Sequence, residues 1–157
     1  MQIIGADLTS VDTTPLHALG QTHSDDKGKE YRYVKLRNET ATVSGVAGDV
    51  VGYLNSPASA EERFTVVTDN TDASLKPVMA GVLTASVAGV LATAYCLWVQ
   101  CKGPVVVNQT IAGSPADGDG VFLSTTDRTL TLATAADDPV CGHALDVSAN
   151  LVYLNCV

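Results

Sequence analysis

The segment Tyr95-Cys-Leu-Trp-Val-Gln-Cys-Lys-Gly103 has the composition of a β-strand. It joins aromatic and β-branched residues, which strands favour, and it ends at a glycine. Alternation along a strand assigns its side chains to two faces, Cys96, Trp98 and Gln100 on one and Leu97, Val99 and Cys101 on the other. The segment is therefore predicted to be the end of a buried strand that covers residues 91–101.

Trp98 is the only tryptophan of the chain. Large aromatic side chains are usually buried, which predicts that Trp98 anchors the core. Tryptophan is also enriched where proteins meet, and the alternative is that Trp98 and Gln100 belong to an oligomer interface.

The strand lies within an uncharged stretch, residues 77–101, that is long enough to span a bilayer. Its composition argues against a membrane helix, because it is rich in Ala, Gly, Ser and Thr and lacks a sustained run of Leu, Ile and Phe. Ala88-Gly89 interrupts it as a turn would. We expect two consecutive buried strands instead, over residues 78–87 and 91–101.

Similar short segments recur along the chain with turn residues between them. The further strands are predicted at residues 31–36, 42–44, 48–54, 63–68, 105–111, 121–124, 129–133, 141–147 and 151–156. Helix is limited to one short turn at residues 58–63. Many short strands at near-regular spacing predict an all-β fold, a compact β-sandwich or barrel of short antiparallel strands.

Residues 1–30 differ from the rest in being polar and in showing neither helical nor strand period. They are predicted to form an extended N-terminal arm whose order depends on what it lies against. Residues 31–157 then form a single β-rich domain, long enough to bury a core of its own.

Charge is distributed unevenly. The chain carries a formal net charge of −8, yet most of its basic residues fall in one short strip, Lys27, Lys29, Arg32, Lys35 and Arg37. An acidic body disfavours nucleic acid and anionic membranes as partners. The basic strip is either a solvated strand edge or a contact for an acidic partner surface.

The cysteines are Cys96, Cys101, Cys141 and Cys156. Their spacing matches no zinc motif, which predicts no metal site, and they are expected to be small buried hydrophobic residues. The N-terminus lacks the features of a secretory signal, so folding in a reducing cytoplasm is expected.

No catalytic constellation is found. His17 and His23 lie in the arm, and His143 lies on a predicted strand without an obvious nucleophile partner. The segment Asp117-Gly-Asp-Gly120 starts like a calcium loop but lacks the later acidic ligand. We expect no enzymatic activity and no cofactor.

The order of several motifs resembles the small capsid decoration proteins of tailed bacteriophages, also called cement or head-stabilising proteins. The motifs are Leu19-Gly20, Gly28-Lys-Glu-Tyr-Arg-Tyr-Val-Lys35, Gly48-Asp-Val-Val-Gly52, Tyr95–Gly103, Gly120-Val-Phe-Leu-Ser-Thr125 and Gly142-His-Ala-Leu145. They span nearly the whole chain, and their order carries the resemblance. The cysteines depart from the pattern.

The resemblance implies a structural protein of the virion, assembled in the host cytoplasm and bound to the outer capsid surface. It would bind the phage major capsid protein across subunit boundaries and would be a homo-oligomer, with a trimer favoured over a dimer. We assign the capsid contact to residues of the arm and of the basic strip: Leu16, Leu19, Lys27, Lys29, Tyr31, Arg32, Lys35 and Arg37.

Two alternatives remain open at this point. One is a receptor- or carbohydrate-binding β-module of a phage fibre or tail, although such sites usually display more aromatic residues than this chain holds. The other is a trimeric β enzyme such as a nucleotide hydrolase, for which no nucleotide cradle is found.

Overall fold

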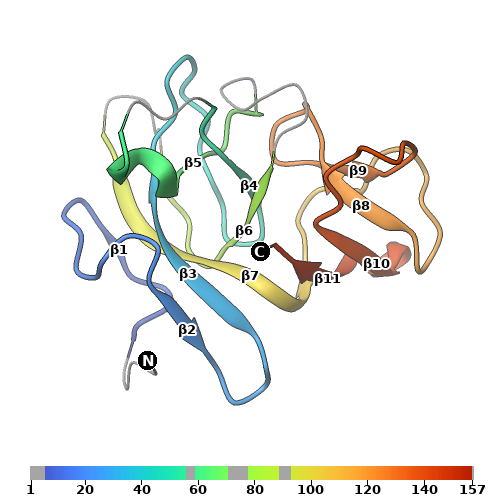
Figure 1. Cartoon of the computed structure of the whole chain (residues 1–157), viewed down its shortest axis with the longest axis horizontal. Coiled ribbons are helices and arrows are strands. Elements are labelled where there is room, and N and C mark those ends of the chain that lie inside the picture. Colours follow the sequence, from blue (N-terminus) through green and yellow to red (C-terminus); the bar gives the residue numbers. More distant parts are fainter. Residues whose placement is uncertain (1–5, 56–58, 71–77, 89–92, 157) are drawn as a thin grey trace.

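Five strands close a β-barrel (Figure 1). Strand β7 pairs with β6 and also with β3, so the order β3-β5-β4-β6-β7 returns to its start. The bounds are β3 Glu30–Leu36, β4 Val50–Tyr53, β5 Thr65–Val67, β6 Met79–Leu83 and β7 Tyr95–Val106. The computed structural model describes residues 6–55, 59–70, 78–88 and 93–156. The predicted all-β class is confirmed, as a barrel with further strands outside it.

One pair in the barrel departs from the expected antiparallel arrangement. Strands β3 and β5 run parallel, with Lys35 opposite Thr65 and Leu36 opposite Val66. Parallel neighbours need a long crossover connection. Residues 37–64 supply it, since they contain β4 and the short 3-10 helix η1 (Glu61–Phe64). The remaining strand pairs are antiparallel.

Strands β3 and β7 each point one face into the barrel, and these are faces that the alternation of their residues predicted. Val34 and Leu36 of β3 meet Leu97 and Val99 of β7, and all four are fully buried. The other members of this cluster are Val51, Val66, Ala80, Leu83 and Val87. The opposite faces of β3 and β7, with Tyr33 and Trp98, point out of the barrel and form a separate cluster.

Strand β7 continues beyond the barrel into a second group of strands (Figure 1). Its last residues pair with β11 (Leu151–Asn155), and the order continues through β10 (Gly142–Asp146), β8 (Gly120–Leu123) and β9 (Leu130–Leu132). Short 3-10 helix η3 (Val147–Ala149) joins β10 to β11. A large apolar cluster lies between these strands and the barrel, and it contains Cys101, Cys141 and Cys156.

The sequence predicted a break at Gly103-Pro104, but β7 runs through it. Hydrogen bonds to the β11 side fall on alternate residues of β7, for example from Cys156 N–H to Cys101 O and from Val107 N–H to Asn150 O. Pro104 occupies a position between such bonds. Its missing N–H therefore costs no ladder bond, which is the condition under which a strand accepts proline.

Two predicted strand segments are wrong. Residues 42–44 form no strand, because the side chains of Asn38 and Thr68 donate hydrogen bonds to the Val43 carbonyl and hold this segment as a loop. Residues 107–111 leave the sheet after β7 ends. Parts of the predicted loop after Asn55 and of the predicted turn and strand around residues 89–92 lie outside the described residues. No helix in the described part of the chain is long and apolar enough to cross a membrane.

The arm contains two strands that the sequence did not reveal. Strand β1 (Val11–Asp12) pairs with β7, and β2 (Thr22–Ser24) pairs with β3. Both are too short to show a strand period. The rings of His17, between the two strands, and of His23, on β2, pack on Trp98 at centroid distances of 5.3 and 6.2 Å. The partner that orders residues 6–30 is thus the chain's own barrel.

We expect Gly81→Ala to lower the free energy of unfolding by about 2–4 kcal/mol. A Cβ at this position would lie 2.5 Å from the Gln100 carbonyl oxygen of the neighbouring strand, which belongs to the barrel wall. Gly118→Ala is the matched control, because Gly118 also has a positive φ but open space around it, and should cost about 1 kcal/mol. Urea denaturation followed by Trp98 fluorescence measures both, and equal losses would contradict the packing argument.

Removal of residues 2–24 should expose Trp98, whose side chain is 0% exposed beneath the arm. Quenching of its fluorescence by acrylamide should rise severalfold, because the covering His17 and His23 rings are lost. Val106→Asp, a change at an exposed position outside the barrel, is the control and should leave the quenching unchanged. Unaltered quenching in the truncated protein would show that the arm does not protect the tryptophan.

Candidate binding groove

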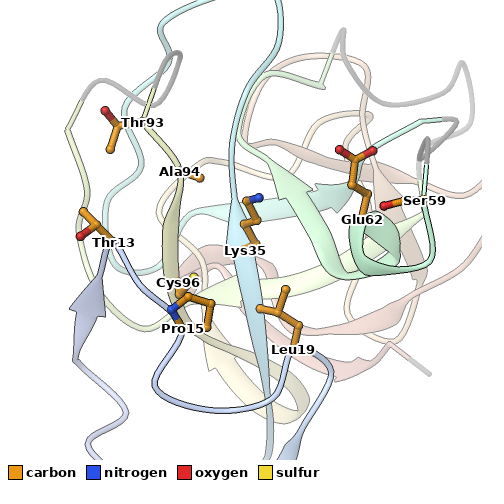
Figure 2. A pocket seen from close by; sticks show the side chains of 9 residues that line it. All are labelled: Thr13, Pro15, Leu19, Lys35, Ser59, Glu62, Thr93, Ala94 and Cys96. Carbon is orange, nitrogen blue, oxygen red and sulfur yellow. The ribbon is translucent and has the colours of Figure 1, made fainter.

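A groove with a volume of about 540 Å³ opens on the outer side of the barrel. It lies between the arm loop that follows β1 and the segment of η1, with β3 and β7 at its base. Figure 2 shows Lys35 among the lining side chains, with Pro15 and Leu19 of the arm near it and Glu62 across from it. The lining residues are Thr13, Pro15, Leu19, Lys35, Ser59, Glu62, Thr93, Ala94 and Cys96.

A second hollow of about 430 Å³ continues the first. The two share Pro15 and Leu19, and together we call them the arm groove. The second hollow is the more apolar of the two, being lined by Pro15, His17, Ala18, Leu19, Ala60 and Phe64. The arm groove thus joins a polar half that contains Lys35 to an apolar half that contains Phe64.

Strand alternation places Lys35 in the arm groove. It follows Tyr33 on the outward face of β3 and is half-buried there, whereas Val34 and Leu36 fill the barrel. In the described part of the chain, the Lys35 ammonium makes no ion pair or hydrogen bond. A lysine in this position offers a positive charge to a ligand on a partly desolvated surface, where an ion pair is stronger than in bulk water.

Glu62, the acidic residue that lines the arm groove, forms an ion pair with Arg37. Glu62 lies 3.6 Å from the Arg37 guanidinium, which also contacts Glu39 at 3.0 Å. Exposed pairs of this kind contribute little to stability. The Arg37 guanidinium does offset part of the negative charge that Glu62 presents to the groove.

Cys96 lies at the base of the polar half and is 2% exposed. Burial raises the pKa of its thiol above the usual value, and the nearby Lys35 ammonium opposes that shift only in part. The thiol is therefore mainly protonated at neutral pH, which makes it a poor nucleophile.

The arm groove gathers some of the residues assigned to capsid contact. Leu16 is 64% exposed on the arm loop, and its N–H donates to the Tyr33 hydroxyl at 3.2 Å. Leu19 and Lys35 line the groove, and Arg37 contacts its acidic wall. The structure thus brings Leu19 of the arm and Lys35 of β3 together in the groove, and places Leu16 and Arg37 beside it.

The other assigned residues lie elsewhere. Lys27 and Lys29 belong to the β2–β3 turn, where their backbone N–H groups donate to the Asp25 carboxylate. The Tyr31 hydroxyl lies 3.3 Å from the same carboxylate. Arg32 points to the opposite side of β3 and donates to the Tyr53 hydroxyl. The basic strip is thus divided by strand alternation and does not form one surface.

Trp98 and Gln100, which the sequence offered in one alternative as an oligomer interface, are buried within the single chain. Trp98 is 0% exposed and Gln100 is 5% exposed within the single chain. The Gln100 amide donates to the carbonyls of Lys102 and Pro104, both at 3.1 Å. Their burial within the chain favours the core role.

The residues considered for catalysis are separated in space or engaged in local structure. His17 and His23 pack on aromatic rings, while His143 is exposed on β10. Asp119 accepts from Ala116 N–H and Asp117 accepts from Val147 N–H, so both carboxylates cap loops. Among the described residues, no group of three or more His, Cys, Asp or Glu side chains could hold a metal ion.

Sequence reasoning missed the far wall of the arm groove, namely Ser59, Ala60, Glu62 and Phe64. One signal was available at Gly20, which has φ +85° and where a Cβ would meet the Phe64 ring at 2.4 Å. A glycine in the arm thus marks a close approach, but the sequence does not say which residue approaches it. No family model, curated protein or solved structure matches the chain.

We expect Lys35→Met to raise the pKa of Cys96 further, because it removes the cation that favours the thiolate. The rate at which a small alkylating agent modifies Cys96 at pH 9 should fall severalfold, because a smaller fraction of the thiol is ionised. Mass spectrometry of the Cys96 peptide measures this rate. Lys102→Met is the control, since Lys102 pairs with Glu30 and does not line the groove. An equal fall in the alkylation rate in both variants would show that Lys35 has no specific effect on the Cys96 thiol.

Proposed function

We propose that this chain is a capsid decoration protein of a tailed bacteriophage, which binds the outer face of the shell and cements neighbouring major capsid protein subunits. The order of motifs along the chain suggests the class. The observation that carries the proposal is the arm groove, which Leu19 and Lys35 line, with Arg37 paired to its Glu62 and exposed Leu16 next to its lining residues Pro15 and His17. These residues combine an exposed apolar contact with a cation available to an acidic group.

The chemistry of the arm groove suits an extended acidic segment of a partner protein. Burial of Leu16 against such a segment would contribute about 1.5–3 kcal/mol. A carboxylate of the partner would meet Lys35 in the polar half, and an apolar side chain would fill the half that contains Phe64. Polar groups would fix the register of the segment while apolar contact supplies affinity.

The groove alone is too small for a stable protein interface, which typically buries about 1,200–2,000 Å² in total. Linking several such sites raises the effective concentration of each and strengthens binding without new contacts. This is why we include a homo-oligomer in the proposal, with a trimer favoured and a dimer as the alternative. Its surface is unassigned, because Trp98 and Gln100 are buried in the single chain.

The mechanism is mechanical. A protein that binds only the assembled lattice stabilises that lattice in proportion to its concentration and affinity. Copies that bridge subunit boundaries on the outer surface of the virion would oppose outward pressure from packaged DNA. The function needs no catalysis, no cofactor and no contact with nucleic acid or membrane.

The test is co-sedimentation with emptied phage heads that have been stripped of their decoration protein. We expect saturable binding at a fixed ratio to capsid subunits, weakened by at least tenfold in Leu16→Asp and in Lys35→Glu. Both changes place a charge that the proposed partner segment would repel or fail to bury. Native mass spectrometry of the free protein reports the oligomeric state.

Two matched controls separate the groove from general effects of charge. Val106→Asp introduces an acid at another exposed apolar position, and Lys102→Glu reverses another half-exposed lysine. Both should bind as the unaltered protein does. If the control variants and the groove variants lost capsid binding equally, the arm groove would not be part of the capsid interface. Absence of all binding by a folded protein would reject the capsid role and direct attention to glycan screening.

A further inference from the structure

Three cysteines gather where the second group of strands meets the barrel. Cys101 lies on β7, Cys141 immediately precedes β10, and Cys156 immediately follows β11. All three belong to the same apolar cluster as Met79. They are free thiols, and each is 2–8% exposed.

Cys141 and Cys156 are in contact. The Cys156 thiol donates to the Cys141 carbonyl oxygen at 3.7 Å, and the neighbouring Cys141 side chain, together with burial, raises the pKa of Cys156. The backbone fixes this approach, because Asn155 N–H donates to Cys141 O at 2.8 Å. Cys141 also contacts the Met79 sulfur at 3.2 Å.

A small cavity gives access to the pair. It has a volume of about 110 Å³ and is lined by Val78, Met79, Pro139, Val140, Cys141, Asn155 and Cys156. Val78 and Val140 are 53% and 48% exposed, so the cavity reaches the surface beside them. It has room for a few water-sized molecules and is far too small for a peptide-sized oxidant.

We propose that Cys141 and Cys156 form an oxidisable pair that hydrogen peroxide converts into a disulfide in the folded protein. The Cys141 thiolate attacks one peroxide oxygen, the O–O bond breaks, and hydroxide leaves to give a sulfenic acid on Cys141. The Cys156 sulfur then attacks the Cys141 sulfur, an S–S bond forms, and the S–OH oxygen leaves as water. In total, two thiols and one peroxide give one disulfide and two waters.

Cys101 is the competing partner for Cys156. It lies directly opposite on β7, with Cys156 N–H donating to Cys101 O at 2.9 Å. Two observations favour Cys141 instead. The Cys156 thiol donates to the Cys141 carbonyl oxygen at 3.7 Å, whereas the Cys101 thiol donates away from the pair, to the Glu30 carbonyl oxygen at 3.4 Å. The cavity exposes Cys141 and Cys156 but not Cys101.

The disulfide would join the start of β10 to the end of β11 and tie down the last strand of the chain. A cross-link that closes a loop of this length removes conformational freedom from the unfolded chain, and the melting temperature should rise by about 5–10 °C. The inference goes beyond the proposed function and does not depend on it. It predicts a chain that folds with free thiols and is reinforced on meeting peroxide.

The experiment treats the folded protein with hydrogen peroxide, blocks free thiols and digests with trypsin. Trypsin cleaves after Lys102 and Arg128, and no Lys or Arg follows Arg128, so Cys141 and Cys156 share the peptide of residues 129–157. We expect this peptide to lose two hydrogen atoms in mass without linking to another. Oxidised glutathione, which is too large for the cavity, should react at least tenfold more slowly.

Two outcomes would overturn the inference. A cross-link between residues 129–157 and the peptide that holds Cys101 would identify the other pair. Retention of both thiols, or their oxidation only to sulfinic acid, would show that they do not couple. Cys141→Ala should abolish the disulfide and the gain in melting temperature, whereas Cys96→Ala and Cys101→Ala should keep both. Peptide mapping of the unaltered protein decides the question even if Cys141→Ala does not fold.

Discussion

The structure depends on the burial of strand β7 on both of its faces. Leu97 and Val99 fill the barrel, while Cys96 and Trp98 point outward and need a cover of their own. The same strand closes the barrel through β3 and β6 and then carries the second group of strands through β11. A strand with one solvated face could make the barrel but would give neither the arm nor the second group a place to pack.

The need to cover Trp98 explains both the arm and the groove. Aromatic surface of this size is costly to leave in water, so residues 6–30 fold back over it with His17, His23 and Leu19. The arm and η1 then form the walls of a hollow over β3 and β7. Stability and proposed binding thus draw on the same segment, and truncation of the arm cannot separate them. Point changes at exposed Leu16 and half-buried Lys35 can, since neither side chain supports the Trp98 cluster.

Strand alternation also divides the charges. Lys35 lies on the outward face of β3 with Tyr31 and Tyr33, whereas Arg32 lies on the other face and reaches Tyr53. A run of basic residues in the sequence therefore becomes separate sites on the molecule. The cysteines show the reverse, because Cys101 on β7, Cys141 next to β10 and Cys156 next to β11 pack into one apolar cluster.

The sequence by itself determined the all-β class, most strands and the two faces of β3 and β7, because a period of two and turn residues act over short distances. It did not reveal β1 and β2, which are too short for a period, or the passage of β7 through Pro104, which is accepted only where β11 needs no N–H. The parallel pairing of β3 with β5, the meeting of Leu19 with Glu62 and Phe64, and the contact of Cys141 with Cys156 were decided by tertiary structure. The first two join segments far apart in the chain and the third depends on how the ends of the neighbouring strands β10 and β11 are placed, so the packing of the whole fold sets them and no local pattern reveals them.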